Sequence, residues 1–533
     1  MDALTRAAIA GTSRETLPAS VLPTDDLFEG AAGKNPERDL LLRAGMRVVY
    51  QAAGRVAESG VEVPRPVPEE TLPACTARAA GLVRDLLMRP YDPQDKINRS
   101  LLREALERLQ CAGLRLPVDL LPVALDGNRP RKLLLPVLGE RGRWIAGLNP
   151  AWRWVEVMYS SKNEETIWEE GALSQRLDVF ERVRRREPAR AREWLADVWH
   201  QEKAEARREM VARLRAGLSG DDESFLESAL DDRSKGVRTT AASLLSRLPA
   251  SAYVGRAVVR ADSIIRAYKR PSGFNLFNRA WMGELIVEPP SVEDEGWKRD
   301  LRGGEVLRSQ DSLRRWVGEK AERIMQALSV VPPQHWEEKF SVEPVDLISA
   351  AAGNDWEAVM LAGWCQAAKR HEDRNWALPL WKRCYEIPEE PEEQGIAWST
   401  ARGLEPLLPQ AAITKALREL RRNEDMPKRL AQALGSVPPP WDEALSTSYR
   451  EVLEKRLRTL SFATSEDPYM WWATLRDAAT HFPTSQLESL DVTLPEEIQA
   501  EHNPTLLADW RRELEKFEET LELRRKLVKE IPL

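Results

Sequence analysis

The sequence predicts an all-α protein, more specifically an irregular HEAT-like α-solenoid of stacked helical hairpins. The strong helix formers Ala, Leu, Glu and Arg are abundant along the 533 residues. The 19 Trp outnumber the 8 Tyr and 9 Phe, a balance that suits helix packing better than a sheet. Apolar residues also recur at three-and-four spacing, as in Leu101, Leu102, Ala105, Leu106 and Leu109.

The clearest repeat unit lies between Ser224 and Pro249. A short apolar helix is followed by an Asp-rich turn at Asp231, and a second helix then opens at Val237. This arrangement is typical of a HEAT-type hairpin, which cannot bury both of its faces alone. One such hairpin therefore predicts stacked neighbours on each side.

We expect four regions along the chain. Residues 1–135 form an N-terminal helical subdomain without Trp, including a helix over 38–57 with Leu41, Leu42 and Val49 on one apolar face. Residues 136–267 form HEAT-like repeats. Residues 268–304, rich in Pro and Gly, form an irregular insertion with a short strand at 285–287, and such insertions are often functional.

Residues 305–533 are expected to form C-terminal helical repeats with a terminal capping helix over 504–529. That helix places apolar residues at heptad a and d positions, with Arg524 interrupting one d position. Docking on the last repeat is favoured over dimerisation. Within the same region Trp356, Trp364, Trp376 and Trp381 either line a pocket or, as is more common, form core between stacked helices.

Charge and motifs exclude several classes of function. The net charge of −7 is untypical of a dedicated nucleic-acid binder. The four Cys and five His form no metal-ligand cluster, and phosphate-loop, dinucleotide and nucleophile-elbow motifs are missing. We therefore expect a non-enzyme without cofactor or metal. An enzyme working through the 268–304 insertion, or through His335 beside Glu337, is the weaker alternative.

The sequence has no stretch of 18 apolar residues, so a transmembrane helix is not expected. The segment Met1–Arg6 does not open a long apolar run, so no signal peptide is expected either. These two features predict a cytoplasmic location.

The most distinctive local sequence runs from Gly139 to Trp152. Its Arg and Trp side chains are of the types enriched at binding hot spots, which makes them candidates for partner binding: Arg141, Arg143, Trp144 and Trp152. The favoured alternative has both Trp in the core of two consecutive helices, with Gly142, Gly147 and Asn149 serving the turns. Asn149 followed by Pro150 predicts a helix start.

The densest positive region is the basic run Arg182–Arg215. It contains three adjacent candidates for partner binding: Arg184, Arg185 and Arg186. These cations could meet phosphates or an acidic partner. Glu residues are interleaved at helical spacing, however, so a solvated face of ordinary salt bridges is the favoured interpretation.

Four segments together resemble one bacterial family of unknown function with HEAT-like helices. They are Gly11-Thr12-Ser13-Arg14, the Gly139–Trp152 stretch, the hairpin Phe225–Pro249 and the stretch from Trp336-Glu337-Glu338-Lys339-Phe340 to Asp355-Trp356. Genes of this family tend to sit beside those for MoxR-type AAA+ ATPases, von Willebrand A-domain proteins and SWIM zinc-finger proteins. The resemblance implies one of the first two as a protein partner, and it brings no activity, cofactor or catalytic residue.

The leading hypothesis is therefore a non-catalytic interaction scaffold or adaptor that holds a protein partner. The runner-up is a nucleic-acid-binding HEAT-like protein that uses the Arg182–Arg215 run. No membrane partner is expected.

Overall fold

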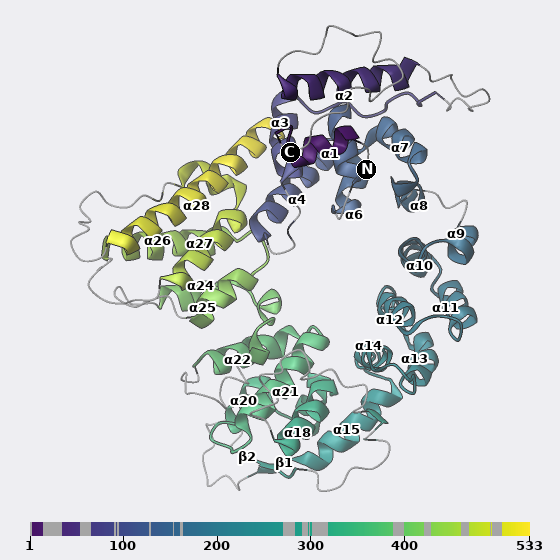
Figure 1. Cartoon of the computed structure of the whole chain (residues 1–533). Helices are drawn as coiled ribbons and strands as arrows, with labels where there is room; N and C mark the ends of the chain where they lie inside the picture. The colour runs from purple at the N-terminus through teal and green to yellow at the C-terminus, as the bar shows by residue number, and fades with distance from the viewer. Residues whose placement is uncertain are drawn as a thin grey trace. The chain divides into compact units, whose positions relative to one another are not determined.

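A computed structural model shows a mostly helical protein (75%), which confirms the all-α prediction (Figure 1). The chain folds as two compact units, residues 1–66 and 67–533. The structure describes residues 3–13, 35–53, 66–89, 92, 95–126, 129–152, 154–159, 164–269, 283–289, 297, 299–300, 318–386, 399–419, 428–459, 468–490, 492 and 504–532. None of the helices in these ranges is long and apolar enough to cross a bilayer.

The first unit contains α1 (Ala3–Ala10) and α2 (Pro36–Ala53). Asn35 starts α2 because its side-chain oxygen accepts a hydrogen bond from the Arg38 N–H at 2.9 Å. Pro36 then occupies the first helical position, where a backbone N–H is not needed. The predicted helix over 38–57 is thus confirmed as far as residue 53, and residues 54–57 lie outside the described residues.

The second unit opens with short helices that share one core of mainly Leu, Ala and Val. The stripe predicted from Leu101 to Leu109 is buried there. The elements are α3 (Ala77–Met88), α4 (Lys96–Cys111), η2 (Val118–Leu120), α5 (Leu121–Leu125), α6 (Arg131–Leu134), η3 (Leu135–Val137), α7 (Gly139–Leu148), η4 (Pro150–Trp152) and α8 (Trp154–Tyr159). The boundary predicted at residue 135 falls within this set of helices, which extends through Val155.

Stacked helices follow and include the predicted hairpin as α13 and α14, with Val237, Ala241 and Leu245 buried. Asp232 orders its turn by accepting a hydrogen bond from the Ser234 N–H at 2.7 Å. The elements are α9 (Glu164–Glu170), α10 (Leu173–Arg186), α11 (Pro188–Val198), α12 (Ala204–Arg213), η5 (Gly220–Asp222), α13 (Glu223–Ala229), α14 (Lys235–Leu245) and α15 (Ala252–Ile264).

A small antiparallel sheet stands where the irregular insertion was predicted. Strand β1 (Ile265–Lys269) pairs with β2 (Gly283–Val287), so that Ile265 lies opposite Val287. The strand predicted at 285–287 is therefore confirmed. Residues 270–282 and most of 290–317 lie outside the described residues.

Helices rich in Trp continue the second unit. Trp364, Trp376 and Trp381 are buried, which confirms their core role, and Trp356 is half-buried. Trp376 also donates a hydrogen bond from Nε1 to Glu337 Oε1 at 2.7 Å. The elements are α18 (Glu319–Val330), α19 (Pro333–Phe340), α20 (Pro344–Ala350), α21 (Glu357–Arg370), α22 (Arg374–Glu386), η6 (Glu405–Leu407), α24 (Gln410–Arg418), α25 (Lys428–Ser436), α26 (Glu443–Thr459), α27 (Tyr469–His481), η7 (Thr484–Ser489) and α28 (Pro504–Glu530).

Helix α28 connects the C-terminal helices of the second unit with its first helices. It packs on α27 and also on α3 and α4 (Figure 1), and Leu527 and Ile531 enter the core of the opening helices. Arg524 pins this contact, with Nε donating to Glu104 Oε2 at 2.8 Å and Nη1 to the Phe482 carbonyl at 2.9 Å. In a solenoid each repeat contacts only its neighbours. The hairpins are present, but a solenoid is not confirmed.

Candidate functional site

The Gly139–Trp152 segment is positioned by a carboxylate from outside it. Gly139 has φ +68°, and a Cβ there would lie 2.5 Å from Glu70 Oε1, so only glycine fits. Glu70 uses this space to cap α7, accepting hydrogen bonds from the Glu140 N–H at 2.6 Å and the Arg141 N–H at 3.3 Å. The negative carboxylate complements the positive end of the helix dipole.

The four candidate residues of this segment have different surroundings. Arg141 is exposed, whereas Arg143 is half-buried and donates to Glu140 at 2.5 Å. Trp144 and Trp152 are half-buried, and Trp152 donates from Nε1 to Asp126 Oδ1 at 2.6 Å. Trp152 also packs against the core of the opening helices. Both interpretations of the Trp pair thus apply in part, since each side chain has a buried and an exposed portion.

The glycines of this segment do not all serve turns. Gly142 and Gly147 lie inside α7, which corrects the prediction for both. Gly142 is there for close packing, since a Cβ would lie 2.8 Å from the Leu138 Cβ. Asn149 does serve a turn, with Oδ1 accepting from the Ala151 N–H at 3.0 Å, and Pro150 opens η4 as predicted.

Arg184, in the basic run, is buried completely and is removed from any exposed binding face. Its guanidinium donates to the carbonyl of Ala216 at 2.8 Å, to that of Gly217 at 3.0 Å and to Asp222 Oδ2 at 2.5 Å. Five donors in a planar fork are well suited to join several carbonyls and a carboxylate in this way. Arg184 therefore ties α10 to the loop after α12.

Most arginines of the run, with the exception of Arg215, are paired with acidic side chains among the described residues. Arg185 donates to Glu181 at 2.7 Å, and Arg186 donates to Glu164 at 2.7 Å. The pKa of Glu187 is lowered by hydrogen bonds from Arg186 and Arg190. Further ion pairs are Arg182–Glu164, Arg190–Glu165, Arg192–Asp222, Arg207–Asp232 and Arg213–Glu209. The interleaved acids expected from the sequence do form salt bridges, and several partners come from other helices.

His335 belongs to a small ionic cluster rather than pairing with its neighbour Glu337. Its Nε2 lies 2.7 Å from Asp262 Oδ1, and Lys339 Nζ lies 2.7 Å from the same oxygen. Burial raises the pKa of Asp262, but the hydrogen bonds from Lys339 and His335 outweigh it and leave that pKa below its ordinary value. In the described ranges, no three His, Cys, Asp or Glu side chains gather in a way that could hold a metal ion.

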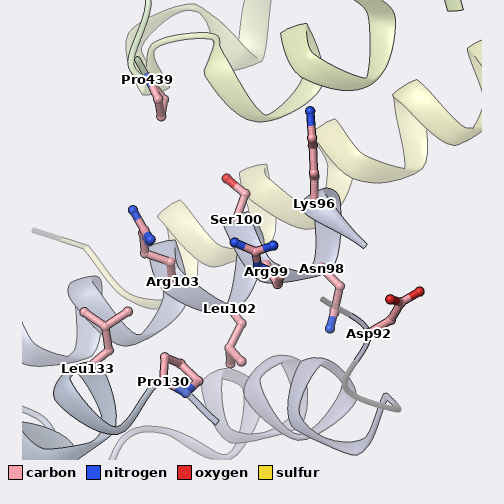
Figure 2. A pocket seen from close by; sticks show the side chains of 10 residues that line it. All are labelled: Asp92, Lys96, Asn98, Arg99, Ser100, Leu102, Arg103, Pro130, Leu133 and Pro439. Atoms are coloured by element: carbon pink, nitrogen blue, oxygen red, sulfur yellow. The ribbon is translucent and has the colours of Figure 1, made fainter. Parts of the chain in front are cut away.

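A cationic cavity of about 310 Å³, which the sequence did not predict, lies beside α4. Its cations are Lys96, Arg99 and Arg103, which recur at i, i+3 and i+7 and therefore share one side of the helix. Figure 2 shows Lys96, Ser100 and Arg103 extending to the same side of α4, with Pro439 on the side of Arg103 and Arg99 between Lys96 and Arg103. The remaining lining residues are Asp92, Asn98, Leu102, Pro130 and Leu133.

The N-terminus of α4 determines the positions of Lys96, Arg99 and Arg103. Asp95 caps α4 by accepting a hydrogen bond from the Asn98 N–H at 2.9 Å, so its carboxylate is engaged by the backbone. Lys96 and Arg103 form no ion pair within the described part of the chain, although Glu107 follows Arg103 by four residues. The spacing of the cations was visible in the sequence. Pro130, Leu133 and Pro439 also line the cavity. Their position beside α4 could not be predicted from the sequence.

By its fold the chain is a helical protein with stacked hairpins, and its candidate sites are exposed or cationic surfaces. It belongs to a family of unknown function, DUF5691, whose family model matches residues 3–531. The resemblance to a family of unknown function is thereby confirmed over nearly the whole chain. Searches among curated proteins and among solved structures find no match.

Proposed function

We propose that the protein is a non-catalytic scaffold or adaptor that holds a protein partner, of the MoxR-type AAA+ ATPase or von Willebrand A-domain class. The observation that carries this proposal is the apolar face of α2. Leu41, Val48 and Val49 are 72%, 66% and 67% exposed, and Leu42 is 37% exposed. Positions i, i+1, i+7 and i+8 fall on one side of a helix, so these four side chains form one stripe.

An exposed apolar stripe of this kind is typical of a helix that docks in a groove of another protein. Scattered exposed apolar residues need no explanation, but four on one helical face expose contiguous area to water. Removing such area from water contributes roughly 25 cal/mol per Å², against which the entropic cost of association is set. A protein surface with an apolar groove suits this stripe, whereas a nucleic acid offers mainly charged phosphates.

The nucleic-acid alternative rests on the Arg182–Arg215 run and is weakened by the pairing of its arginines. A phosphate that approached Arg185 or Arg186 would have to compete with Glu181 and Glu164. Binding to nucleic acid releases counterions only to the extent that the cations are available to phosphates. The alternative predicts a salt-dependent affinity for DNA, and lack of binding at low salt would remove it.

The test is a pull-down of the full-length tagged protein from its native host, comparing the wild type with the variant Leu41→Glu, Val48→Glu, Val49→Glu. We expect the wild type to enrich a MoxR-type ATPase or a von Willebrand A-domain protein. The triple variant should lose that enrichment, because three buried carboxylates in the interface would each lack a partner. The purified candidate partner then repeats the comparison by calorimetry.

The matched control is Val259→Glu on α15, a valine that is 71% exposed outside α2. It introduces the same charge and should leave the partner enrichment intact. If neither class of partner is enriched by the wild type, or if the triple variant still binds, the proposal is wrong.

A further inference from the structure

We propose that the cationic cavity beside α4 binds a phosphate monoester that also carries hydroxyl groups, such as a sugar phosphate. The site is separate from the α2 stripe, so it goes beyond the scaffold proposal and can fail independently. Three observations carry it. They are the local charge, an unpartnered buried amide, and the volume of the cavity.

The local charge is opposite in sign to that of the whole chain. The protein has a net charge of −7, yet this cavity is lined by Lys96, Arg99 and Arg103 against the single carboxylate of Asp92. Lys96 and Arg103 form no ion pair in the described residues, in contrast to Arg185 and Arg186 of the basic run. Asp477 interacts with Lys96 only through longer-range electrostatics. Cations that form no direct ion pair attract a dianionic group, and the guanidinium fork matches phosphate oxygens in pairs.

Asn98 provides an independent indication of a ligand. Its side chain lines the same cavity, is 5% exposed, and keeps its Oδ1 buried without a hydrogen-bond partner. A buried amide group without a partner destabilises a protein by about 1–3 kcal/mol, so such groups are uncommon unless something else satisfies them. A ligand hydroxyl, which can donate to Oδ1, meets this requirement.

The arrangement assigns each part of the ligand to one flank of the cavity. The phosphate lies against Lys96, Ser100 and Arg103, which extend to the same side of α4 in Figure 2. The hydroxyl-bearing part reaches the flank formed by Asn98 and Leu102. A volume of about 310 Å³ lies at the lower end of the range for small-molecule sites and matches a sugar phosphate rather than a dinucleotide.

The experiment titrates the full-length protein by calorimetry with glucose 6-phosphate, inorganic phosphate, AMP and glucose. We expect glucose 6-phosphate to bind saturably, with a Kd of roughly 1 mM or lower. Inorganic phosphate should bind more weakly. Glucose should not bind up to about 10 mM. Tighter binding of AMP than of glucose 6-phosphate would identify a nucleotide as the source of the phosphate. If none of the phosphate compounds saturates, the proposal is overturned.

Variants separate this site from general electrostatic attraction. Lys96→Gln and Arg103→Gln should each weaken glucose 6-phosphate binding roughly tenfold, the effect of losing one charged hydrogen bond. Arg511→Gln removes one exposed positive charge from α28, outside the cavity, and should leave the affinity unchanged. Equal weakening by all three variants would show that no specific site exists.

Asn98→Leu tests the second half of the proposal. It should weaken the binding of glucose 6-phosphate but not that of inorganic phosphate, because only the sugar reaches Asn98. The ligand-free protein should not lose stability, since Oδ1 accepts no hydrogen bond there. Equal weakening of both ligands would overturn the assignment of the hydroxyl flank.

Discussion

The chain contains two groups of cations that differ in one respect, namely whether they form direct ion pairs with acidic side chains. In the Arg182–Arg215 run, Arg185 and Arg186 are bonded to Glu181 and Glu164, and Arg184 is buried against Asp222. Beside α4, Lys96 and Arg103 line a cavity and form no ion pair in the described part of the chain. The Arg182–Arg215 run has more cations, but they are less available to bind an external anion.

The difference teaches that a count of basic residues is a poor guide to a binding surface. A run of arginines on one helix attracts acids from the helices packed beside it, and the resulting pairs are worth little for either stability or binding. A few cations at a cavity that form no ion pair among the described residues retain their attraction for an external anion. The predictions below test this contrast, beginning with the largest expected effect.

Replacing Arg184 should produce the largest loss of stability. Arg184→Met leaves Asp222 and several carbonyls in the interior without their main donor, and we expect a loss of about 3–5 kcal/mol. Urea unfolding followed by circular dichroism measures it. The neighbouring exposed variant Arg185→Met is the control and should stay within about 0.5 kcal/mol of the wild type. A small effect of Arg184→Met would contradict its assignment as a structural residue.

Arg524 represents a third kind of cation, one that joins distant parts of the second unit. Arg524→Met removes the bonds to Glu104 and to the Ala479 and Phe482 carbonyls. We expect a loss of about 2–3 kcal/mol, smaller than for Arg184 because Glu104 keeps Arg108 as a partner. Unfolding curves and protease sensitivity near residue 104 measure it. Unchanged protection there would show that α28 is not held by this residue.

Acidification should destabilise the protein through two half-buried histidines, His371 and His481. Burial lowers the pKa of His481 below 6.5, with Arg524 and Lys96 acting in the same direction and Asp477 against them. Burial likewise lowers the pKa of His371. The unfolded chain therefore takes up protons first, and stability is lost as the pH falls below about 6.5. Burial raises the pKa of Asp477, which opposes this loss at more acidic pH.

The measurement compares the Tm of the wild type with that of the double variant His371→Gln/His481→Gln at several pH values between about 7.5 and 5.5. The double variant should show a shallower decline than the wild type. Identical slopes would mean that the two histidines do not cause the loss.

The smallest expected effect concerns the exposed cations of both groups. Arg185→Gln with Arg186→Gln, and Lys96→Gln with Arg103→Gln, should each change stability by no more than about 1 kcal/mol. The two double variants should differ in ligand binding, because only the Lys96 and Arg103 double variant should weaken the binding of glucose 6-phosphate. A loss of ligand binding from the Arg185 and Arg186 double would reverse the comparison.

The sequence predicted local elements well because their signals are local. The α4 stripe, the α13–α14 hairpin, the strand at 285–287 and the Asn149-Pro150 start all depend on residues within one or two turns. The role of Gly142 was misassigned because its close neighbour Leu121 comes from another element.

The candidate sites were harder to predict because they depend on contacts distant in sequence. Nothing near Arg184 indicates that Asp222 and the 214–217 carbonyls surround it. Arg524 resembled a defect in a heptad pattern, whereas Glu104 supplies its reason from 420 residues away. The α4 cavity needs Pro439 beside Arg103, a neighbour that periodicity on one helix cannot reveal.

The closure by α28 also has a consequence in time during synthesis. The core of the opening helices includes Leu527 and Ile531, and Glu104 gains its second partner, Arg524, only 420 residues later. At roughly 5–20 residues per second, a ribosome needs about 20–80 s to synthesise that intervening chain. During this interval the apolar positions that α28 covers stay open to water, so the nascent chain should depend on chaperones most strongly before α28 emerges.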